Sequence, residues 1–373
     1  MEALFFVEDP GAANFIAPLW SYVSHQLGPT PLLGTGTAVR YLRDQGIPVE
    51  LLSAHDLPLL LREIEPVVLI SGTSANIDSH GLHLIDIAKS LDIVTVAAVD
   101  AANNPARRFR GRSRDALAHA PDWMLVPDDD IGFLYEQLGY PSTRIVVSGH
   151  PHYDTIRDRA SRISIAERAD LRRRLLNVDD LGRQVIVFAA EPANTLDPSD
   201  SRLSASYSLR GRGRSVTRSA IVLEEFLDAI AHVTPRPYVV IRLHPRMRVE
   251  ELGSLVSEAD FISQLEGSFE VLVASDAVVG MTSMALVEAV LLGRPTLSIV
   301  PIASESQILP TTRKGITPWV SSRATLVEAL SALLASNAQP DGKLIERHLK
   351  TGATARGGEL LIELIRTSQR LGI

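Results

Sequence analysis

Residues 275–300 read S-D-A-V-V-G-M-T-S-M-A-L-V-E-A-V-L-L-G-R-P-T-L-S-I-V, and this stretch decides the fold class. A short apolar run is followed by a turn at Gly280, then by an apolar helical stretch that stops at Gly293, and then by a second apolar run. Glycine suits the turn and the helix end because it has no Cβ. A strand, a helix and a strand in this order predict a βαβ unit, whose two strands lie parallel in one sheet.

The rest of the chain repeats this alternation. The short runs are continuously apolar, which is typical of strands in a parallel sheet that helices cover on both faces. We therefore predict doubly wound α/β architecture. The expected strands are 3–7, 30–33, 67–71, 93–99, 123–126 and 144–148, then 185–189, 238–243, 277–279 and 295–299. The expected helices are 13–26, 38–45, 80–90, 131–138, 163–176, 219–231, 249–254, 284–292, 326–334 and 358–371.

The pattern breaks once, after Asp154, into an arginine-rich helical stretch, and then restarts. A chain of 373 residues suits two domains better than one. We predict an N-terminal acceptor-binding domain over 1–155, a linker and helix over 156–180, a C-terminal nucleotide-sugar domain over 181–345, and a final helix over 346–373.

The composition narrows the functional classes. Apolar residues make up 45% and charged residues 22%, as in ordinary globular proteins, and the net charge of −7 argues against a general nucleic-acid binder. The absence of cysteine excludes disulfides, thiol catalysis and cysteine metal sites. No signal peptide and no run of 18 uncharged apolar residues is evident, so we expect a cytoplasmic protein without a transmembrane segment. Peripheral membrane association stays open.

Three polar side chains stand directly before or inside the expected helix over 284–292. Thr282 and Ser283 stand where the helix begins, a place where free backbone N–H groups bind phosphate. Either residue could equally be a simple N-cap. Glu288 lies inside the apolar helix, where it would accept hydrogen bonds from ribose hydroxyls or else occupy an exposed helix edge.

The pattern S-D-x-V-V-G-x-T-S-x-x-x-x-E-A-x-x-x-G-R-P resembles the donor-site segment of GT-B glycosyltransferases and of the sugar-nucleotide 2-epimerases that share their fold. The resemblance implies two Rossmann-like domains facing a cleft that holds a nucleotide-linked sugar. It implies that Thr282 and Ser283 bind donor phosphate, beside Gly280, and that Glu288 holds the ribose.

A second motif, V-V-I-R-L-H-P-R over 239–246, reads as a buried strand that ends in Arg242, His244 and Pro245. Strand ends line the binding crevice in open α/β sheets. The motif resembles the His-Pro motif of bacterial sialyltransferases, Kdo transferases and capsule or teichoic-acid polymer transferases. This implies that His244 and Pro245 contact the donor nucleotide, with Arg242 adding positive charge. The alternative is a histidine bonded to backbone at a strand end.

A third motif, V-V-S-G-H-P-H-Y-D over 146–154, resembles the segment that closes the first domain in the same families. It makes His150 a candidate cleft residue. A hinge turn formed around Gly149 and Pro151 is the structural alternative, and we favour it slightly.

The N-terminal half supplies candidate acceptor residues. Glu8 and Asp9 follow the first strand, and Gly11 and Asn14 open the first helix, which is the setting of a ligand loop but not of a dinucleotide fingerprint. Glycosyl transfer needs a base near the acceptor hydroxyl, so Glu8 and Asp9 are candidates, although Asp9 could instead be a helix N-cap.

Asp100 is the rival base. It opens D-A-A-N-N-P-A-R-R-F over 100–109, which resembles a D-x-x-x-N-x-x-x-R-F piece of polysaccharide-biosynthesis members of this fold. Asp100 could equally be a structural partner of Arg107 or Arg108, and Arg107 is itself a candidate cleft residue.

Four further features complete the candidates. Glu191 and Asn194 follow the first strand of the second half, at a position that covers the donor. Asp128, Asp129 and Asp130 read as a helix start rather than a metal cluster. Two arginine-rich segments, 107–114 and 199–217, indicate an anionic acceptor or else are solvated loops.

Together these features predict a metal-independent glycosyltransferase of polysaccharide or glycoconjugate biosynthesis, which uses a nucleotide-sugar as co-substrate and no cofactor. A UDP-sugar 2-epimerase, hydrolysing or non-hydrolysing, is the alternative, and a non-catalytic nucleotide-sugar binding protein is a third. The sugar, the nucleotide, the acceptor, the stereochemistry, the identity of the base and the oligomeric state stay open.

Overall fold

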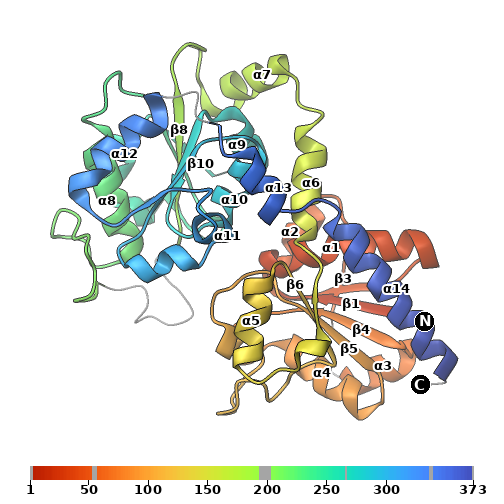
Figure 1. The fold of residues 1–373 in the computed structure, drawn as a ribbon. Coiled ribbons are helices and arrows are strands. Elements are labelled where there is room, and N and C mark those ends of the chain that lie inside the picture. The colour runs from red at the N-terminus through yellow and green to blue at the C-terminus, as the bar shows by residue number, and fades with distance from the viewer. Residues whose placement is uncertain (1–2, 53–56, 193–202, 265–266, 336–338, 372–373) are drawn as a thin grey trace. The chain divides into compact units, whose positions relative to one another are not determined.

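The computed structural model describes residues 3–52, 57–192, 203–264, 267–335 and 339–371. The chain divides into two compact units, Met1–Thr155 with Leu349–Ile373 and Ile156–His348 (Figure 1). The stretch 156–180, expected as a linker, belongs to the second unit, and the last 25 residues return to the first.

The first unit contains a seven-stranded, fully parallel sheet with the order β3-β2-β1-β4-β5-β6-β7. Its strands are β1 (Ala3–Val7), β2 (Leu32–Gly34), β3 (Glu50–Leu51), β4 (Val68–Gly72), β5 (Val94–Ala98), β6 (Trp123–Val126) and β7 (Ile145–Val147). Its helices are α1 (Pro10–Leu27), α2 (Gly36–Asp44), α3 (Leu57–Ile64), α4 (His80–Ser90), α5 (Asp129–Gln137), the start of α6 (Pro151–Ala160) and α14 (Ala353–Leu371).

Both faces of this sheet are buried, as the continuous apolar runs predict. Phe5 of β1 packs on one face with α1, α2 and α14, whereas Phe6 packs on the other face with α3, α4 and α5. Successive side chains of a strand point to opposite faces, so a strand covered on both sides must be apolar at every position. Figure 1 shows α14, in dark blue, lying along α1, and Leu361 and Ile365 of α14 are fully buried in that layer.

The second unit contains a six-stranded parallel sheet with the order β10-β9-β8-β11-β12-β13. Its strands are β8 (Val185–Ala189), β9 (Tyr238–Arg242), β10 (Phe261–Ser263), β11 (Ala277–Gly280), β12 (Thr296–Ile299) and β13 (Trp319–Val320). Its helices are the rest of α6, α7 (Ile165–Leu176), α8 (Arg218–Ile230), α9 (Phe269–Ala274), α10 (Met284–Leu291), α11 (Pro310–Arg313), α12 (Arg323–Ala335) and α13 (Gly342–His348), with a 3₁₀ segment, η3 (Val249–Glu258).

The core of the second unit repeats the same layering. Ile186 and Phe188 of β8 pack with α8, α12 and η3 on one face, and α9 and α10 contact β8, β11 and β12. Asp276, directly before β11, accepts hydrogen bonds from the Val185 N–H (2.8 Å) and from Arg168 and Arg172 of α7. This aspartate anchors α7 to the sheet, and for that reason the stretch expected as a linker is part of the unit.

Strand order also indicates where a ligand site is expected. In both sheets the chain adds strands first to one side and then to the other, so that the order reverses between β1 and β4 and between β8 and β11. The carboxyl ends of the strands at such a switch point line the ligand crevice of open α/β sheets. Each unit therefore has one place where a site is expected on topology alone.

Candidate functional site

At the switch point of the first sheet, acidic side chains follow β1 and β5. Glu8 accepts hydrogen bonds from the Ser79 hydroxyl (2.6 Å) and the Asn76 amide (3.3 Å). Asp9 is the N-cap of α1 and accepts from the Ala12 N–H (2.9 Å), as the N-cap interpretation of this residue predicts. Asp100 lies against Gly11: a Cβ on Gly11 would overlap one oxygen of Asp100 and lie 3.4 Å from one oxygen of Asp9. Only glycine fits there.

Asp100 is held by a buried arginine. Arg108, with 6% of its side chain exposed, donates from Nη1 to Asp100 Oδ1 (2.6 Å) and to the Thr73 hydroxyl (2.8 Å). Its other nitrogens donate to the backbone and side chain of Asn103 (3.2 and 2.8 Å). Burial lowers the pKa of Arg108, but the charges of Asp100, Tyr135 and Asp9 together with the hydrogen bond to Asp100 outweigh this, so the pKa is raised. Arg108, and not Arg107, is therefore the structural partner of Asp100.

Asp9 and Asp100 lie close together but have different environments. Burial and the neighbouring charge of Asp100 raise the pKa of Asp9 from 3.8 to about 6, against the opposing effects of the Ala12 N–H and Arg108. A carboxylate with a pKa near neutrality can accept a proton from a reacting hydroxyl. Asp100 forms an ion pair with Arg108, and Asp9 stays a candidate base.

Three further candidates of the first unit have structural contacts. The Asn14 side-chain oxygen accepts from the Tyr41 hydroxyl (2.8 Å), which ties α1 to α2. Arg107 is half-buried at the end of η1 (Pro105–Arg107). His150 is only 3% exposed, because it stacks on Tyr153 (ring centroids 4.7 Å apart) and packs against Phe15 (4.9 Å). The His150 ring is therefore engaged in packing within the first unit, and its role as a cleft residue stays a prediction.

The third motif, residues 146–154, contacts the C-terminal segment of the chain. Asp154 accepts hydrogen bonds from the backbone N–H groups of Gly352 and Thr354 (both 2.9 Å), directly before and within the first turn of α14. The Arg356 guanidinium donates to the Ser148 carbonyl (3.0 Å). The motif thus fixes the returning C-terminal segment to the first unit.

At the switch point of the second sheet, four charged and polar side chains form what we call the switch-point cluster: Glu191, Arg218, Thr282 and Glu305. Glu191 follows β8 and accepts from both the N–H (2.5 Å) and the hydroxyl (3.0 Å) of Thr282, which follows β11. Arg218, the first residue of α8, donates to Glu191 (3.1 Å) and to Glu305 (2.6 Å). Both carboxylates are only 16% exposed.

Three other candidate residues of the 275–300 stretch, Ser283, Glu288 and Gly280, lie in different structural settings. Ser283 is the N-cap of α10, and its hydroxyl accepts from the Ala285 N–H (3.3 Å). Glu288 is 6% exposed and accepts from the Ser268 hydroxyl, so it does not occupy an exposed helix edge. Gly280 is the last residue of β11 rather than the start of a turn, since it pairs in register with both neighbouring strands, and a side chain there would press on the Ala189 carbonyl at 3.3 Å.

The end of β9 carries the second motif. His244 Nδ1 accepts from the Arg246 N–H (3.2 Å), which leaves the ring proton on Nε2. Burial and the charges of Arg246 and Arg242 lower the pKa of His244 from 6.5 to about 4, so that the imidazole is neutral at pH 7. Arg242 is buried, whereas Pro245 is exposed. A neutral imidazole that presents Nε2–H is a hydrogen-bond donor for an oxygen of a base or phosphate.

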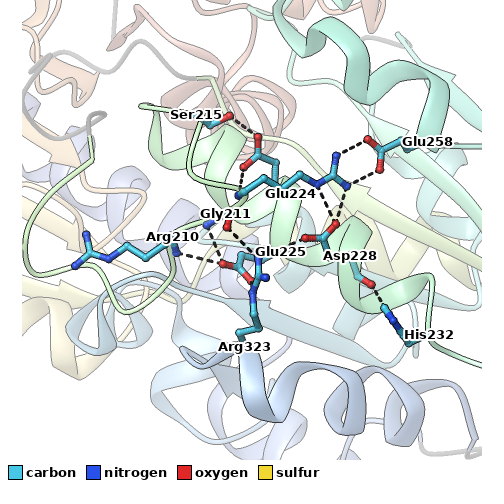
Figure 2. A network of polar contacts seen from close by, with 10 residues as sticks. Arg210, Gly211, Ser215, Glu224, Glu225, Asp228, His232, Glu258 and Arg323 are labelled. Carbon is cyan, nitrogen blue, oxygen red and sulfur yellow. Dashed lines mark hydrogen bonds and ion pairs between the residues drawn. The ribbon is translucent and has the colours of Figure 1, made fainter.

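Two arginines of the second arginine-rich segment, Arg210 and Arg212, make internal contacts. Arg212 pairs with Asp228 (2.7 Å) and Glu258 (2.6 Å). The backbone N–H groups of Arg210 and Gly211 donate to Glu225 (3.1 and 2.8 Å) (Figure 2). Arg212 is thus paired with carboxylates of its own unit, and the anionic acceptor stays a prediction. Residues 199–202 of the segment and Asn194 lie outside the described residues.

The aspartates at 128–130 start a helix, as expected. Asp128 is the N-cap of α5 and accepts from the Ile131 N–H (2.9 Å). Over the described ranges, no group of three or more histidine, aspartate or glutamate side chains is arranged to hold a metal ion. Nor does that part of the chain contain a helix with the length and apolarity needed to cross a bilayer.

The sequence indicated Arg108 only as one of two possible partners of Asp100, and it contained no indication of Arg218 or Glu305 as site residues. One signal was present for Arg218, because a cation in the first turn of a helix opposes the helix dipole and requires a nearby anion. Arg108 stands among five arginines in eight residues, and the sequence does not distinguish the buried one.

Comparison with known proteins shows what this architecture is similar to. No protein-family model matches the sequence, and no curated protein matches it significantly. Solved structures do match over nearly the whole chain. UDP-GlcNAc 2-epimerase from Neisseria meningitidis, bound to UDP-GlcNAc, is 14% identical with a TM-score of 0.67, and the match covers 98% of this chain and 100% of that one.

Two other matches are of a different kind. HepE of Anabaena, in complex with UDP, is 12% identical with a TM-score of 0.58, covering 100% of this chain and 98% of that one. The wall teichoic acid polymerase TagF is 13% identical with a TM-score of 0.62, covering 99% and 89%. The chain has the GT-B fold. At 12–14% identity these matches show the fold and not the activity.

Proposed function

We propose that this GT-B protein is a glycosyltransferase, which moves a sugar from a nucleotide-sugar donor to an acceptor in polysaccharide or glycoconjugate biosynthesis. The observation that carries the proposal is the pair of switch points. The second unit presents hydrogen-bond donors and cations for a nucleotide, and the first presents a carboxylate whose pKa suits a base.

On the donor side, the ends of three adjacent strands contribute. His244 follows β9, Glu191 follows β8 and Thr282 follows β11, in that spatial order. The neutral His244 Nε2–H binds an oxygen of the nucleotide, and Thr282 and Ser283 bind phosphate. Glu288 is the candidate for the ribose hydroxyls. Donors already in place stabilise the nucleotide as negative charge develops on it.

On the acceptor side, Asp9 is the base. The acceptor oxygen bonds to the anomeric carbon while its proton passes to Asp9. The bond from that carbon to the phosphate oxygen breaks, and the nucleotide leaves with the electron pair. No metal or cofactor takes part in this scheme. Asp100 and Arg108 set the environment of Asp9, and Glu8 adds a further negative charge to it.

A UDP-sugar 2-epimerase is the second candidate, favoured by the match to UDP-GlcNAc 2-epimerases over the full chain. Epimerisation needs acids and a histidine around the sugar ring. Of the groups available for this, His150 is packed between aromatic rings and Glu191 is engaged by Thr282 and Arg218. Direct transfer needs one base, and Asp9 supplies it.

The test is thermal unfolding with a panel of nucleotides: UDP, CDP, CMP, GDP, dTDP and NAD. A ligand at about 100 times its dissociation constant adds roughly 2.7 kcal/mol, which raises the melting temperature by about 5–10 °C. We expect one sugar-carrier nucleotide to shift wild type and not His244→Ala. His232→Ala is the matched control, because its imidazole bonds the Asp228 carbonyl (2.8 Å) on the surface of the same unit.

A flat response to every carrier, or a response to NAD alone, would contradict the donor site. The reaction is then tested with the sugar form of the nucleotide that binds. Release of free nucleotide that depends on an added glycan acceptor supports transfer, formation of the 2-epimer without acceptor supports the epimerase, and binding with no product supports a non-catalytic protein.

A further inference from the structure

The switch-point cluster contains one cation for two partly buried carboxylates. Arg218, with 13% of its side chain exposed, lies between Glu191 and Glu305. Glu305 accepts hydrogen bonds from both Nε and Nη2 of the guanidinium (3.1 and 2.6 Å), and these two bonds fix the plane of the Arg218 guanidinium. Glu191 is bonded through Nη1 (3.1 Å) and is not needed to hold Arg218 in place.

The contacts of Glu191 are those that a phosphate oxygen would make. Its two oxygens accept from a backbone N–H, from a hydroxyl and from a guanidinium, which belong to Thr282 and Arg218. Arg218 Nη2 also lies 3.4 Å from the Thr282 hydroxyl, so the donors converge on one place. Charge-assisted bonds of this kind are the usual means by which proteins hold both carboxylate and phosphate.

Positive charge continues on the other side of β8. The Ala190 N–H donates to the Arg242 carbonyl (2.9 Å), so the segment leading to Glu191 is fixed beside the end of β9, which carries Arg242 and His244. A group with more than one anionic centre thus finds donors on both sides of β8.

We infer that Glu191 is an internal stand-in for a donor phosphate: its carboxylate occupies an oxyanion site built by Thr282 and Arg218, and a diphosphate group takes these donors when it binds. This inference rests on the proposed function for the identity of the ligand, a nucleoside diphosphate. It assigns Arg218 as the phosphate-binding cation. It also changes the role of Glu191 from a donor-binding residue to a competitor of the donor.

The site then has a defined order of events. Glu191 turns away, Arg218 stays oriented by Glu305, and the phosphate oxygens replace the carboxylate oxygens on the same N–H and hydroxyl. The apparent affinity for diphosphate is reduced by the fraction of time that Glu191 occupies the site. Removing the charge of Glu191 should therefore strengthen binding, although it deletes an ion pair.

The experiment measures binding of inorganic pyrophosphate and of UDP by titration calorimetry. We expect Glu191→Gln to bind pyrophosphate about tenfold more tightly than wild type, and Arg218→Met to bind it about tenfold more weakly. Glu191→Ala is a second variant that vacates the site fully, and it too should bind more tightly. Thermal unfolding of each variant verifies that it is folded.

Glu225→Gln is the matched control. Glu225 is also a buried glutamate that accepts two backbone N–H bonds and pairs with one arginine, Arg323, but it lies within α8 in the network of Figure 2. It should lose stability and keep its pyrophosphate affinity. If Glu191→Gln behaves like this control, or binds pyrophosphate more weakly, Glu191 is a structural latch or a ligand contact and the inference is overturned.

The two ligands separate this inference from the proposed function. Tighter pyrophosphate binding with no UDP binding in any variant would support the oxyanion site and remove the nucleotide donor. UDP binding to wild type that neither Glu191→Gln strengthens nor Arg218→Met weakens would keep the nucleotide donor and overturn the stand-in.

Discussion

Asp9 has two tasks that use the same carboxylate. As the N-cap of α1 it satisfies the Ala12 N–H, and as the candidate base it needs a pKa near neutrality. The two are compatible because one oxygen accepts from the backbone, and burial beside Asp100 still disfavours the ionised form. A group held in an unfavourable charge state at pH 7 is typical of functional sites.

Asparagine at position 9 tests this directly. The pKa of Asp9 is raised from 3.8 to about 6, so the folded protein binds the extra proton more tightly than the unfolded chain. The stability that this gives is fully present below about pH 3.8, and is lost as the pH rises to about 6. Asp9→Asn keeps an N-cap and removes the charge, so relative to wild type it should gain about 2 kcal/mol between pH 4 and pH 7.5.

Urea unfolding of both proteins across that range gives the measurement. The same variant should abolish transfer at every pH if Asp9 is the base. Parallel stability curves for Asp9→Asn and wild type would show that Asp9 titrates normally, and would return Asp100 and Glu8 to consideration.

Single residues were predictable where their chemistry depends on neighbours in sequence, and not where it depends on neighbours in space. Asp128 is an N-cap because of the residues that follow it, and the sequence indicated this. Arg108 contacts both Asp100 and Thr73, which is 35 residues earlier in the chain, and no local pattern distinguishes it from Arg107. The burial of His150 depends on Phe15, which comes from a distant part of the chain.

At the scale of elements, the central strands were found and three of the four edge strands were missed, whereas the fourth edge strand, β7, was predicted over 144–148. β1, β6 and β8 were predicted with the observed bounds because both faces are buried and every residue is apolar. β3, β10 and β13 are two or three residues long at sheet edges, and β3 is exposed at both residues. A pattern of burial cannot reveal a strand that is not buried.

Asp276 shows how one carboxylate joins several elements. Burial raises its pKa, but the Val185 N–H and the two arginines of α7 outweigh this and hold its pKa below 3.8. The stability gained from Asp276 is therefore present above its unfolded pKa of about 3.8 and is lost as the pH falls below that value. Asp276→Asn should cost about 2–3 kcal/mol at pH 7, and the deficit should shrink below pH 4.

Asp260 is the matched comparison, because it accepts the Val239 N–H (2.8 Å) at the start of β9 and also pairs with two arginines. Its partners, Arg183 and Arg236, are 34% and 40% exposed, whereas Arg172 beside Asp276 is 7% exposed. Asp260→Asn should thus cost less, since exposed pairs contribute little. Equal losses in chemical denaturation would refute the anchoring role of the buried pair.

For the whole molecule, the repeated alternation of strands and helices predicted the fold, whereas the position of the candidate site depends on the strand order. Ten apolar runs separated by helices were enough to predict two doubly wound units. The sequence could not give the strand order, and the strand order brings Glu191 to Thr282 and Asp100 to Asp9. The sequence therefore indicated these residues as separate candidates. It did not indicate Arg218, and it left Arg107 and Arg108 as equal possible partners of Asp100.

The division of the chain makes one further prediction, since the first unit is built from both ends of the sequence. Leu361, Ile362 and Ile365 of α14 are buried in the layer that contains Leu19 and Val23 of α1. Burial of each such side chain contributes about 1.5–3 kcal/mol, so removal of α14 costs an amount comparable to the whole stability of a domain. A chain ending at residue 348 should therefore unfold in its first unit and keep its second.

Hydrogen exchange read peptide by peptide measures this. In the truncated chain, peptides from residues 3–155 should exchange rapidly, whereas those from β8, β9 and β11 should stay protected and should still respond to the nucleotide that stabilises the intact protein. Leu361→Ala in the full chain provides the graded control, with partial loss confined to the first unit. Loss of protection throughout the truncated chain would mean that the two cores do not fold independently, in which case the donor site of the second unit would need the first unit in order to form.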